Sequence, residues 1–293
     1  MSSIRVLYFG MPVGFSGPPL RRLIESDLDV CAAVLPKSEG GGLKAELPQD
    51  SFILHPSAFS LVVGDIPVIE VGSLKEAAAL DRLAACRPDV ICVACFPMIF
   101  PPALLAVPPL GCLNLHPSLL PRYRGPAPLF WQFRAGETET GVTVHFMDRG
   151  ADTGDIALQR RVHFPDGLNG EQVDRLCAEA GGELLVEAVR LLGQGRCPRV
   201  KQSEAGVAPS AAPWPAASDF EMSPAWPARR AFNFARGTAH WGMPYEIRVG
   251  EERLLLTRAL SYSLAEKLER PWRAEGRAAA VQFADGVVYF EAA

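Results

Sequence analysis

The sequence has little of what marks secreted, membrane-spanning or disulfide-bonded proteins. Its 293 residues contain seven cysteines, an odd number scattered through apolar segments, which does not predict a disulfide framework. No apolar run approaches the ~20 residues that cross a bilayer. The first residues also lack the basic region and the long apolar region of a signal peptide. We therefore expect a cytoplasmic protein without a membrane span.

Metal-ligand spacing is also scarce. Cys92 and Cys95 form a lone C-x-x-C pattern within the apolar segment 90–95, which predicts a buried strand. Positions three apart on a strand face opposite sides of the sheet. Neither a second cysteine pair nor a nearby histidine completes a zinc site. The pattern therefore predicts two core cysteines, and we expect no metal.

Charge of one sign and several common catalytic motifs are missing too. The net charge is −4, which gives no general indication of nucleic-acid binding. There is no H-E-x-x-H motif, no P-loop and no G-x-G-x-x-G dinucleotide fingerprint. A G-x-S-x-G elbow is absent as well, which argues against a serine hydrolase.

What the chain does have is a regular alternation of strand and helix patterns over residues 1–195. This alternation predicts a Rossmann-like α/β fold, with a mainly parallel sheet and helices on both faces. A long amphipathic helix is predicted over 172–192. The strands are expected at residues 4–9, 30–35, 68–71, 89–95, 112–116, 140–147 and 156–164.

The composition changes after this alternating region. Residues 196–217 are rich in proline, alanine and serine, which predicts an extended linker. Gly250-Glu251 and Asp285-Gly286 each separate two apolar runs, as in hairpins. We therefore expect a catalytic domain over 1–195, a linker over 196–217 and a small, mostly β, OB-like barrel domain over 218–293.

The first candidate site residues are Asn114 and His116, near the end of the predicted strand 112–116. Residues two apart project from the same face of a strand. A buried amide without partners costs a few kcal/mol, so Asn114 either bonds locally or faces a cleft. An amide and an imidazolium can hold an oxyanion, and a carboxylate can raise the pKa of the imidazole. The pair therefore fits acyl transfer.

A carboxylate partner is expected from the polar turn at residues 148–155, although the spacing does not decide between Asp148, Asp152 and Asp155. His145 and His163 lie in alternating strands and are expected to be core or surface residues. Arg122 and Arg124 flank Tyr123 beside the candidate site. They either form a solvated basic loop or bind an anionic group of a substrate.

Two long segments carry a family resemblance. Residues 114–128 resemble the signature of the 10-formyltetrahydrofolate-dependent formyltransferases, and residues 141–143 with 147–155 resemble the second motif of that family. The resemblance covers residues 4–195. The linker and the C-terminal β domain make the layout most similar to the methionyl-tRNA formyltransferases.

The resemblance implies a catalytic set of Asn114, His116 and Asp152, with 10-formyltetrahydrofolate as the formyl donor. Asn114 and a protonated His116 would hold the oxyanion, and Asp152 would keep the imidazole charged. From their position beside this set, we expect Arg122 and Arg124 to bind the substrate. The residues expected to contact the folate are Phe96, Met98, Ile99, Ser118, Leu119, Leu120, Pro121, Asp148 and Ala151.

The acceptor amine stays open at this point. Initiator methionyl-tRNA is the best single expectation, but the segment 218–293 carries ten basic and ten acidic residues and so offers no basic field. The loop at 36–66 is also not basic. The alternatives are a small amine, such as an amino-sugar nucleotide or a biosynthetic intermediate, or a different class of activity, namely hydrolysis of 10-formyltetrahydrofolate or folate binding without turnover.

Overall fold

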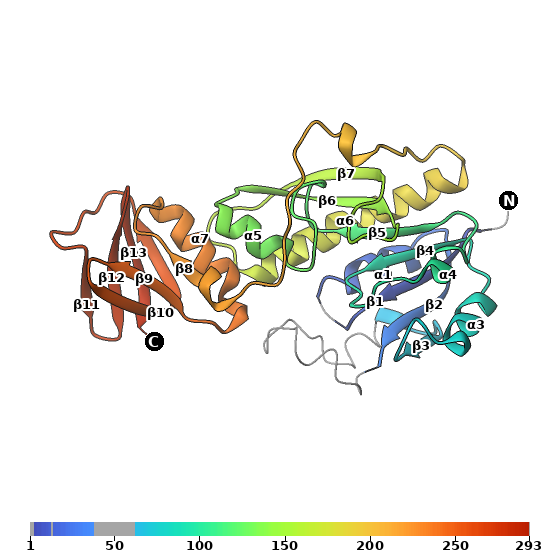
Figure 1. The fold of residues 1–293 in the computed structure, drawn as a ribbon, viewed down its shortest axis with the longest axis horizontal. Coiled ribbons are helices and arrows are strands. Elements are labelled where there is room, and N and C mark those ends of the chain that lie inside the picture. The colour runs from blue at the N-terminus through green and yellow to red at the C-terminus, as the bar shows by residue number, and fades with distance from the viewer. Residues whose placement is uncertain (1–2, 13, 38–61, 293) are drawn as a thin grey trace.

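The computed structural model describes residues 3–12, 14–37 and 62–292 (Figure 1). Two sheets lie at opposite ends of an elongated molecule, with helices between them. Most of the loop predicted at 36–66 lies outside the described residues. Within the described part, no helix is both long enough and apolar enough to cross a membrane.

The first sheet is mainly parallel. In the described residues it has seven strands, in the spatial order β3 (Val68–Val71), β2 (Asp29–Pro36), β1 (Arg5–Gly10), β4 (Val90–Ala94), β5 (Cys112–His116), β6 (Glu139–Phe146) and β7 (Ile156–His163). The strands from β3 to β5 pair in parallel, whereas β6 is antiparallel to both β5 and β7. The sequence predicted each of these strands.

Helices cover both faces of this sheet because its strands are apolar on both faces. One face packs against α1 (Gly17–Ile24) and α6 (Gly170–Gly193). The other face packs against α3 (Ala77–Ala85) and α4 (Pro102–Leu105). Asn169 caps α6 with a reciprocal bond to Gln172, which fixes where this long helix begins.

The second sheet is formed by the C-terminal part of the chain. Its strands lie in the order β11 (Trp272–Glu275), β12 (Ala278–Phe283), β13 (Gly286–Ala292), β10 (Glu252–Ser263), β9 (Tyr245–Val249) and β8 (Glu221–Met222). All these pairs are antiparallel except β8 with β9. The predicted fold class, a mainly parallel sheet with helices plus a second β unit, is confirmed.

Aromatic packing joins the two sheets. Phe130 lies in α5 (Pro128–Ala135), and Phe234 lies in α7 (Ala228–Thr238). Their ring centroids are 5.5 Å apart, and Phe130 also contacts Phe220 of η2 (Ala217–Phe220) at 5.1 Å and Trp241 of η3 (Ala239–Trp241) at 5.6 Å. One apolar core therefore continues from the first sheet to the second.

The segment expected to be a linker packs along the first sheet. Val200 forms a bridge with Ile156 at the start of β7, and Ala211 forms one with Arg124. Between them lies η1 (Gln202–Glu204), whose Gln202 is buried. The proline-rich composition predicted the extended backbone but not these contacts.

Candidate active site

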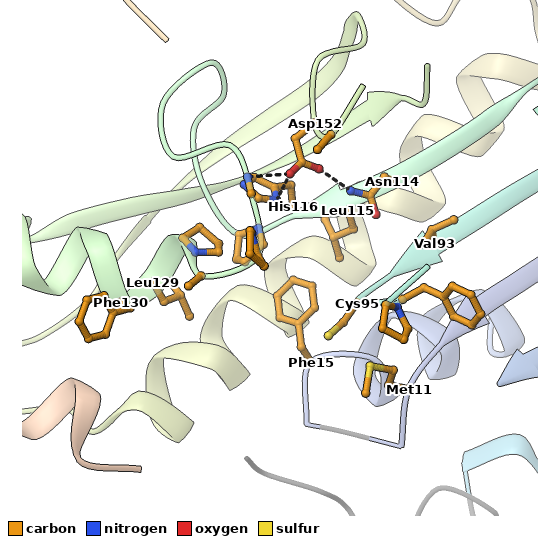
Figure 2. A pocket seen from close by; sticks show the side chains of 18 of the residues that line it. Met11, Phe15, Val93, Cys95, Asn114, Leu115, His116, Leu129, Phe130 and Asp152 are labelled. Atoms are coloured by element: carbon orange, nitrogen blue, oxygen red, sulfur yellow. Dashed lines mark hydrogen bonds and ion pairs between the residues drawn. The ribbon is translucent and has the colours of Figure 1, made fainter. Parts of the chain in front are cut away.

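A cleft of about 470 Å³ opens at the carboxyl ends of β1, β4 and β5. Met11, Cys95 and His116 line the cleft, and they follow or end these three strands (Figure 2). The strand order reverses between β1 and β4. Ligands of open α/β sheets bind at such switch points. The cleft therefore lies where the sequence placed its polar candidates.

The structure brings Asn114, His116 and Asp152 together at one wall of this cleft (Figure 2). Oδ1 of Asp152 accepts a hydrogen bond from Nδ2 of Asn114 at 3.2 Å, and its Oδ2 lies 3.6 Å from Nδ1 of His116. The backbone N–H of Gly125 also donates to Oδ2, at 2.9 Å. Neither Asp148 nor Asp155 makes these contacts, so the geometry selects Asp152 from the three aspartates of the turn.

Backbone conformation around the site is unusual. Among the described residues, four non-glycine residues have a positive φ, and three of them surround this cluster: Cys95 (57°), Tyr123 (61°) and Asp152 (54°). Such conformations cost free energy outside glycine and are retained where function or packing requires them. Asp is among the residues that tolerate this region best, so the turn that presents Asp152 has a suitable residue at its strained position.

The proton on His116 can be located from its neighbours. Nε2 lies 2.8 Å from the carbonyl oxygen of Tyr123, which can only accept, so Nε2 carries a proton and donates. Nδ1 is then the nitrogen that faces Asp152. Burial lowers the pKa of His116, and this effect outweighs the attraction to Asp152 that would raise it. Burial therefore favours the neutral imidazole of His116 in the free protein, and the expected role of Asp152 in keeping the ring charged during the reaction stays a prediction.

Asp152 itself stays ionised. Burial alone would raise the pKa of this carboxyl, but attraction to the imidazolium form of His116, the interaction with His145 and the Gly125 N–H hold the pKa well below its usual range. A neutral imidazole with a free Nδ1 thus faces a carboxylate. This arrangement is ready to take up a proton, because the imidazolium formed would meet an anion immediately.

His145 is a site residue that the sequence did not identify. Its Nε2 lies 3.1 Å from Nδ2 of Asn114 and 3.4 Å from Oδ1 of Asp152, and its Nδ1 donates to the carbonyl of Phe146. With Nδ1 as the donor, the ring can accept at Nε2 from Asn114. The only signal for this contact is the antiparallel register that pairs Asn114 with His145, and a sequence alone does not give that register.

The amide of Asn114 is oriented by these partners. Its Nδ2 must face the carboxylate of Asp152, because a carboxylate only accepts. The second N–H points to His145, and no described group donates to Oδ1. Figure 2 shows the nitrogen turned toward Asp152 and the oxygen turned away from it. In the free protein both amide N–H groups of Asn114 thus face protein partners, and the oxyanion role expected from the sequence stays a prediction.

The residues expected to contact a folate fall into two groups. Five of them line the cleft, namely Phe96, Met98, Ile99, Asp148 and Ala151. Ile99 presents an apolar side chain that is 79% exposed, and Phe96 is held edge-on against Phe9. The other four follow His116 along the chain and do not line the cleft: Ser118, Leu119, Leu120 and Pro121. All of them except Leu119 are buried.

Arg122 and Arg124 both have partners within the protein. Arg122 forms an ion pair with Glu137 and donates to the hydroxyl of Tyr123. Arg124 donates to Oε1 of Gln202 through Nε at 2.9 Å and through its terminal nitrogen at 2.5 Å. Neither side chain lines the cleft. The structure thus places both arginines in the support of the loop.

Gln202 connects that support to Asp152. Its Nε2 donates to the backbone carbonyls of Asp152 and Gly154, both at 2.8 Å, while its Oε1 accepts from Arg124. The segment 196–217 therefore holds the turn that carries the carboxylate. Sequence reasoning missed this role because the partners are about fifty positions apart along the chain.

Of Cys92 and Cys95, only Cys95 differs from the expectation of two core cysteines. Cys92 is buried in β4, as predicted. Cys95 is exposed and faces the cleft, because β4 ends at Ala94 and the backbone turns at the next residue. No three His, Cys, Asp or Glu side chains gather as a metal site within the described ranges.

Comparisons with known proteins agree with this geometry. Residues 39–189 match the family model of the formyl transferases. The methionyl-tRNA formyltransferase of Pelotomaculum thermopropionicum is 39% identical over 241 residues, which cover 81% of this chain and 73% of that protein. That of Syntrophus aciditrophicus is 40% identical over 205 residues, 70% of this chain and 64% of its own length. The chain therefore belongs to the formyl transferase family.

A solved structure shares the fold over the whole chain. It is the N-formyltransferase of Helicobacter canadensis in complex with folinic acid and dTDP-3-aminofucose, which superposes with a TM-score of 0.64 at 14% identity and covers 99% of both chains. At this identity the likeness concerns the fold alone. It shows that both sheets, and not only the first, recur together in another protein.

Proposed function

We propose that this protein transfers the formyl group of 10-formyltetrahydrofolate to a primary amine, and that the amine is that of initiator methionyl-tRNA. The observation that carries the proposal is the contact of Asn114, His116 and Asp152 at one wall of the cleft, with an uncharged Nδ1 of His116 facing an ionised carboxylate. The segment 196–217 belongs to the support of this site, between a catalytic domain at 1–195 and a β domain at 218–293.

The cleft fits the folate as a substrate. A flat ring needs apolar walls and a few polar groups that fix its orientation. Phe96, Met98 and Ile99 supply an apolar wall, and the turn with Asp148 and Ala151 supplies a polar one. These five residues would hold the pterin. The formyl group would then lie toward Asn114 and His116.

The transfer begins with the attack of the amine on the formyl carbon. Oδ1 of Asn114, which no described group occupies, would accept a hydrogen bond from the amine and direct its lone pair. The bond between the amine nitrogen and the formyl carbon forms, and the proton released from that nitrogen goes to Nδ1 of His116. Asp152 stabilises the imidazolium, and the imidazolium in turn stabilises the negative charge on the formyl oxygen.

The second half of the reaction returns this proton. The bond between the formyl carbon and N10 of the folate breaks, and Nδ1 of His116 gives its proton to N10. His116 is then neutral again, and Asp152 has remained a carboxylate throughout. The formylated amine and tetrahydrofolate are the products, so no covalent enzyme intermediate forms.

The curated relatives favour methionyl-tRNA as the acceptor. Two proteins with that name are 40% and 39% identical to this chain over 205 and 241 aligned residues. An amino-sugar nucleotide stands second, because the Helicobacter canadensis structure contains dTDP-3-aminofucose and shares the fold. We propose that either reaction takes place in the cytoplasm.

One experiment separates these functions. Purified protein is incubated with 10-formyltetrahydrofolate and methionyl-tRNA, with dTDP-3-aminofucose, or with no amine, and the products are identified by mass spectrometry. Formyl-methionyl-tRNA supports the proposal, and a formylated sugar nucleotide shifts the acceptor to the second candidate. Formate released without any amine would indicate a hydrolase. Tetrahydrofolate that never forms would overturn formyl transfer altogether.

A further inference from the structure

The proposed transfer does not use the carboxyl of Asp174, which also belongs to the cleft. Asp174 lies on α6, one turn after Gly170, and both residues line the cleft. A Cβ on Gly170 would overlap the backbone of Gly237 and the ring of His240, so the start of α6 lies directly against α7 and η3. Asp174 therefore belongs to the wall formed by α6, α7 and η3, and the folate residues come from other segments.

The carboxyl of Asp174 has no hydrogen-bond or ion-pair partner among the described residues. All other described aspartates around the cleft have one: Asp152 accepts from Asn114, and Asp148 accepts from Thr153. The oxygens of Asp174 are therefore available to a donor group on a molecule that binds in the cleft.

The surroundings of Asp174 are mostly apolar. The same cleft is lined by the aromatic rings of Phe15, Phe133 and Trp241. The titratable groups that face Asp174 are Glu171 and Cys177 on its own helix, Cys95 after β4, and His240 of η3. Burial and the charge of Glu171 raise the pKa of Asp174 to about 7. The cleft of the free protein thus offers a carboxyl that can accept hydrogen bonds, and aromatic rings line the same cleft.

We propose that Asp174 binds the acceptor substrate, by accepting a hydrogen bond from an N–H or O–H group that stands next to an apolar part of that molecule. The assignment rests on the formyl transfer proposed above and describes the acceptor end of the same cleft. An aminoacyl ester with an apolar side chain fits this end well, because its amine N–H and ribose hydroxyl groups are donors beside a thioether. An amino sugar offers the donors without the apolar side chain.

The kinetic test uses Asp174→Ala and Asp174→Asn, with Glu187→Gln as a matched control on the exposed part of α6. The acceptor KM is expected to rise about 10- to 100-fold in Asp174→Ala, as for a lost hydrogen bond to a charged group. Asp174→Asn, which keeps an acceptor oxygen, should recover part of this loss. The folate KM and kcat at saturating acceptor should stay within about twofold, and Glu187→Gln should match the parent protein.

Stability and pH separate a binding role from a structural one. The pKa of Asp174 is higher in the folded than in the unfolded protein, so the folded state loses stability as the pH rises from the ordinary pKa of an aspartate toward 7. Asp174→Asn should therefore melt at the same temperature as the parent at pH 4 and at a higher temperature at pH 8. A rise of the acceptor KM in a more stable variant is the signature of binding, since loss of a structural contact would lower both stability and affinity.

The results of these tests distinguish the role of Asp174 from the proposed formyl transfer. If the parent protein transfers formyl groups and Asp174→Ala keeps the parental acceptor KM, then Asp174 does not bind the acceptor, while the proposed function stands. If the parent transfers no formyl group to any amine, the proposed function fails first. When the KM for methionyl-tRNA rises and that for an amino sugar does not, the donor that Asp174 meets is specific to the aminoacyl ester.

Discussion

Replacing Asp152 by Asn should stop most of the proton transfer while keeping the fold of the turn. Asn tolerates the positive φ of 54° at this position as well as Asp does. The amide oxygen of the new side chain can still accept from the Gly125 N–H. What is lost is the negative charge that lies 3.6 Å from Nδ1 of His116.

The size of the effect follows from that distance. Two unit charges 3.6 Å apart interact by about 4 to 5 kcal/mol at an effective dielectric constant of ~20, and this interaction exists only after His116 has taken up the proton. The loss therefore falls mainly on the transition state and predicts a decrease of about 10³-fold in kcat. The pKa of His116 should fall further below its ordinary value, because Asp152 is the main group that raises it.

Single-turnover formyl transfer at saturating folate and acceptor measures this step directly. Asp155→Asn is the matched control, since Asp155 belongs to the same turn but does not line the cleft. Thermal unfolding verifies that both variants fold. Transfer by Asp152→Asn within about tenfold of the parent, with normal folding, would refute the role of the carboxylate as the partner of a protonated His116.

Three other changes test the support of the site. Gly154→Ala places a Cβ against the carbonyl of Phe146, so the Asp152 turn should shift, with a loss of at least about 3 kcal/mol of stability in urea unfolding and most of the activity. Gln202→Leu leaves the carbonyls of Asp152 and Gly154 without their donor and should lower kcat by about tenfold with little change in folate KM. His240 has a pKa lowered by burial to about 4, so stability should fall from pH 6.5 toward pH 4, by up to about 3 kcal/mol, and His240→Gln should lose this part of the pH dependence. Unchanged unfolding curves would contradict the first and third expectations, and unchanged kcat the second.

The sequence predicted the parts of the site that depend on local periodicity. Asn114 and His116 share a face because side chains alternate along a strand, and the strand was recognisable from its apolar residues. The long helix α6 was recognisable for the same reason. Its amphipathic pattern did not reveal that Asp174 faces a cleft, because that depends on the segments packed against the helix.

Contacts between distant segments could not be predicted in this way. The meeting of His145 with Asn114 follows from the register of β5 against β6, and a shift of one residue would turn His145 to the other face of the sheet. For Arg122 and Arg124, the sequence suggested a ligand where the structure has partners within the protein. A basic Arg-Tyr-Arg loop beside a site suggests anion binding. In the structure, Glu137 pairs with Arg122 and Gln202 accepts from Arg124, and only the fold determines where these two partners lie.

The hydrogen bonds of the free protein explain why the site needs two histidines. If Asp152 had His116 as its sole partner, the proton could rest on Nδ1, and the imidazole would start the reaction already charged. Asn114 and Gly125 instead satisfy both carboxylate oxygens, and His145 holds the second amide N–H of Asn114. Burial then keeps His116 neutral, and its Nδ1 stays open until an amine delivers a proton. His145 thus acts through Asn114 on the orientation of the amine, so His145→Phe should raise the acceptor KM. The pKa of His116 should be higher in His145→Phe than in Asp152→Asn, because the first variant keeps the carboxylate. NMR titration of the His116 ring in both variants measures this difference.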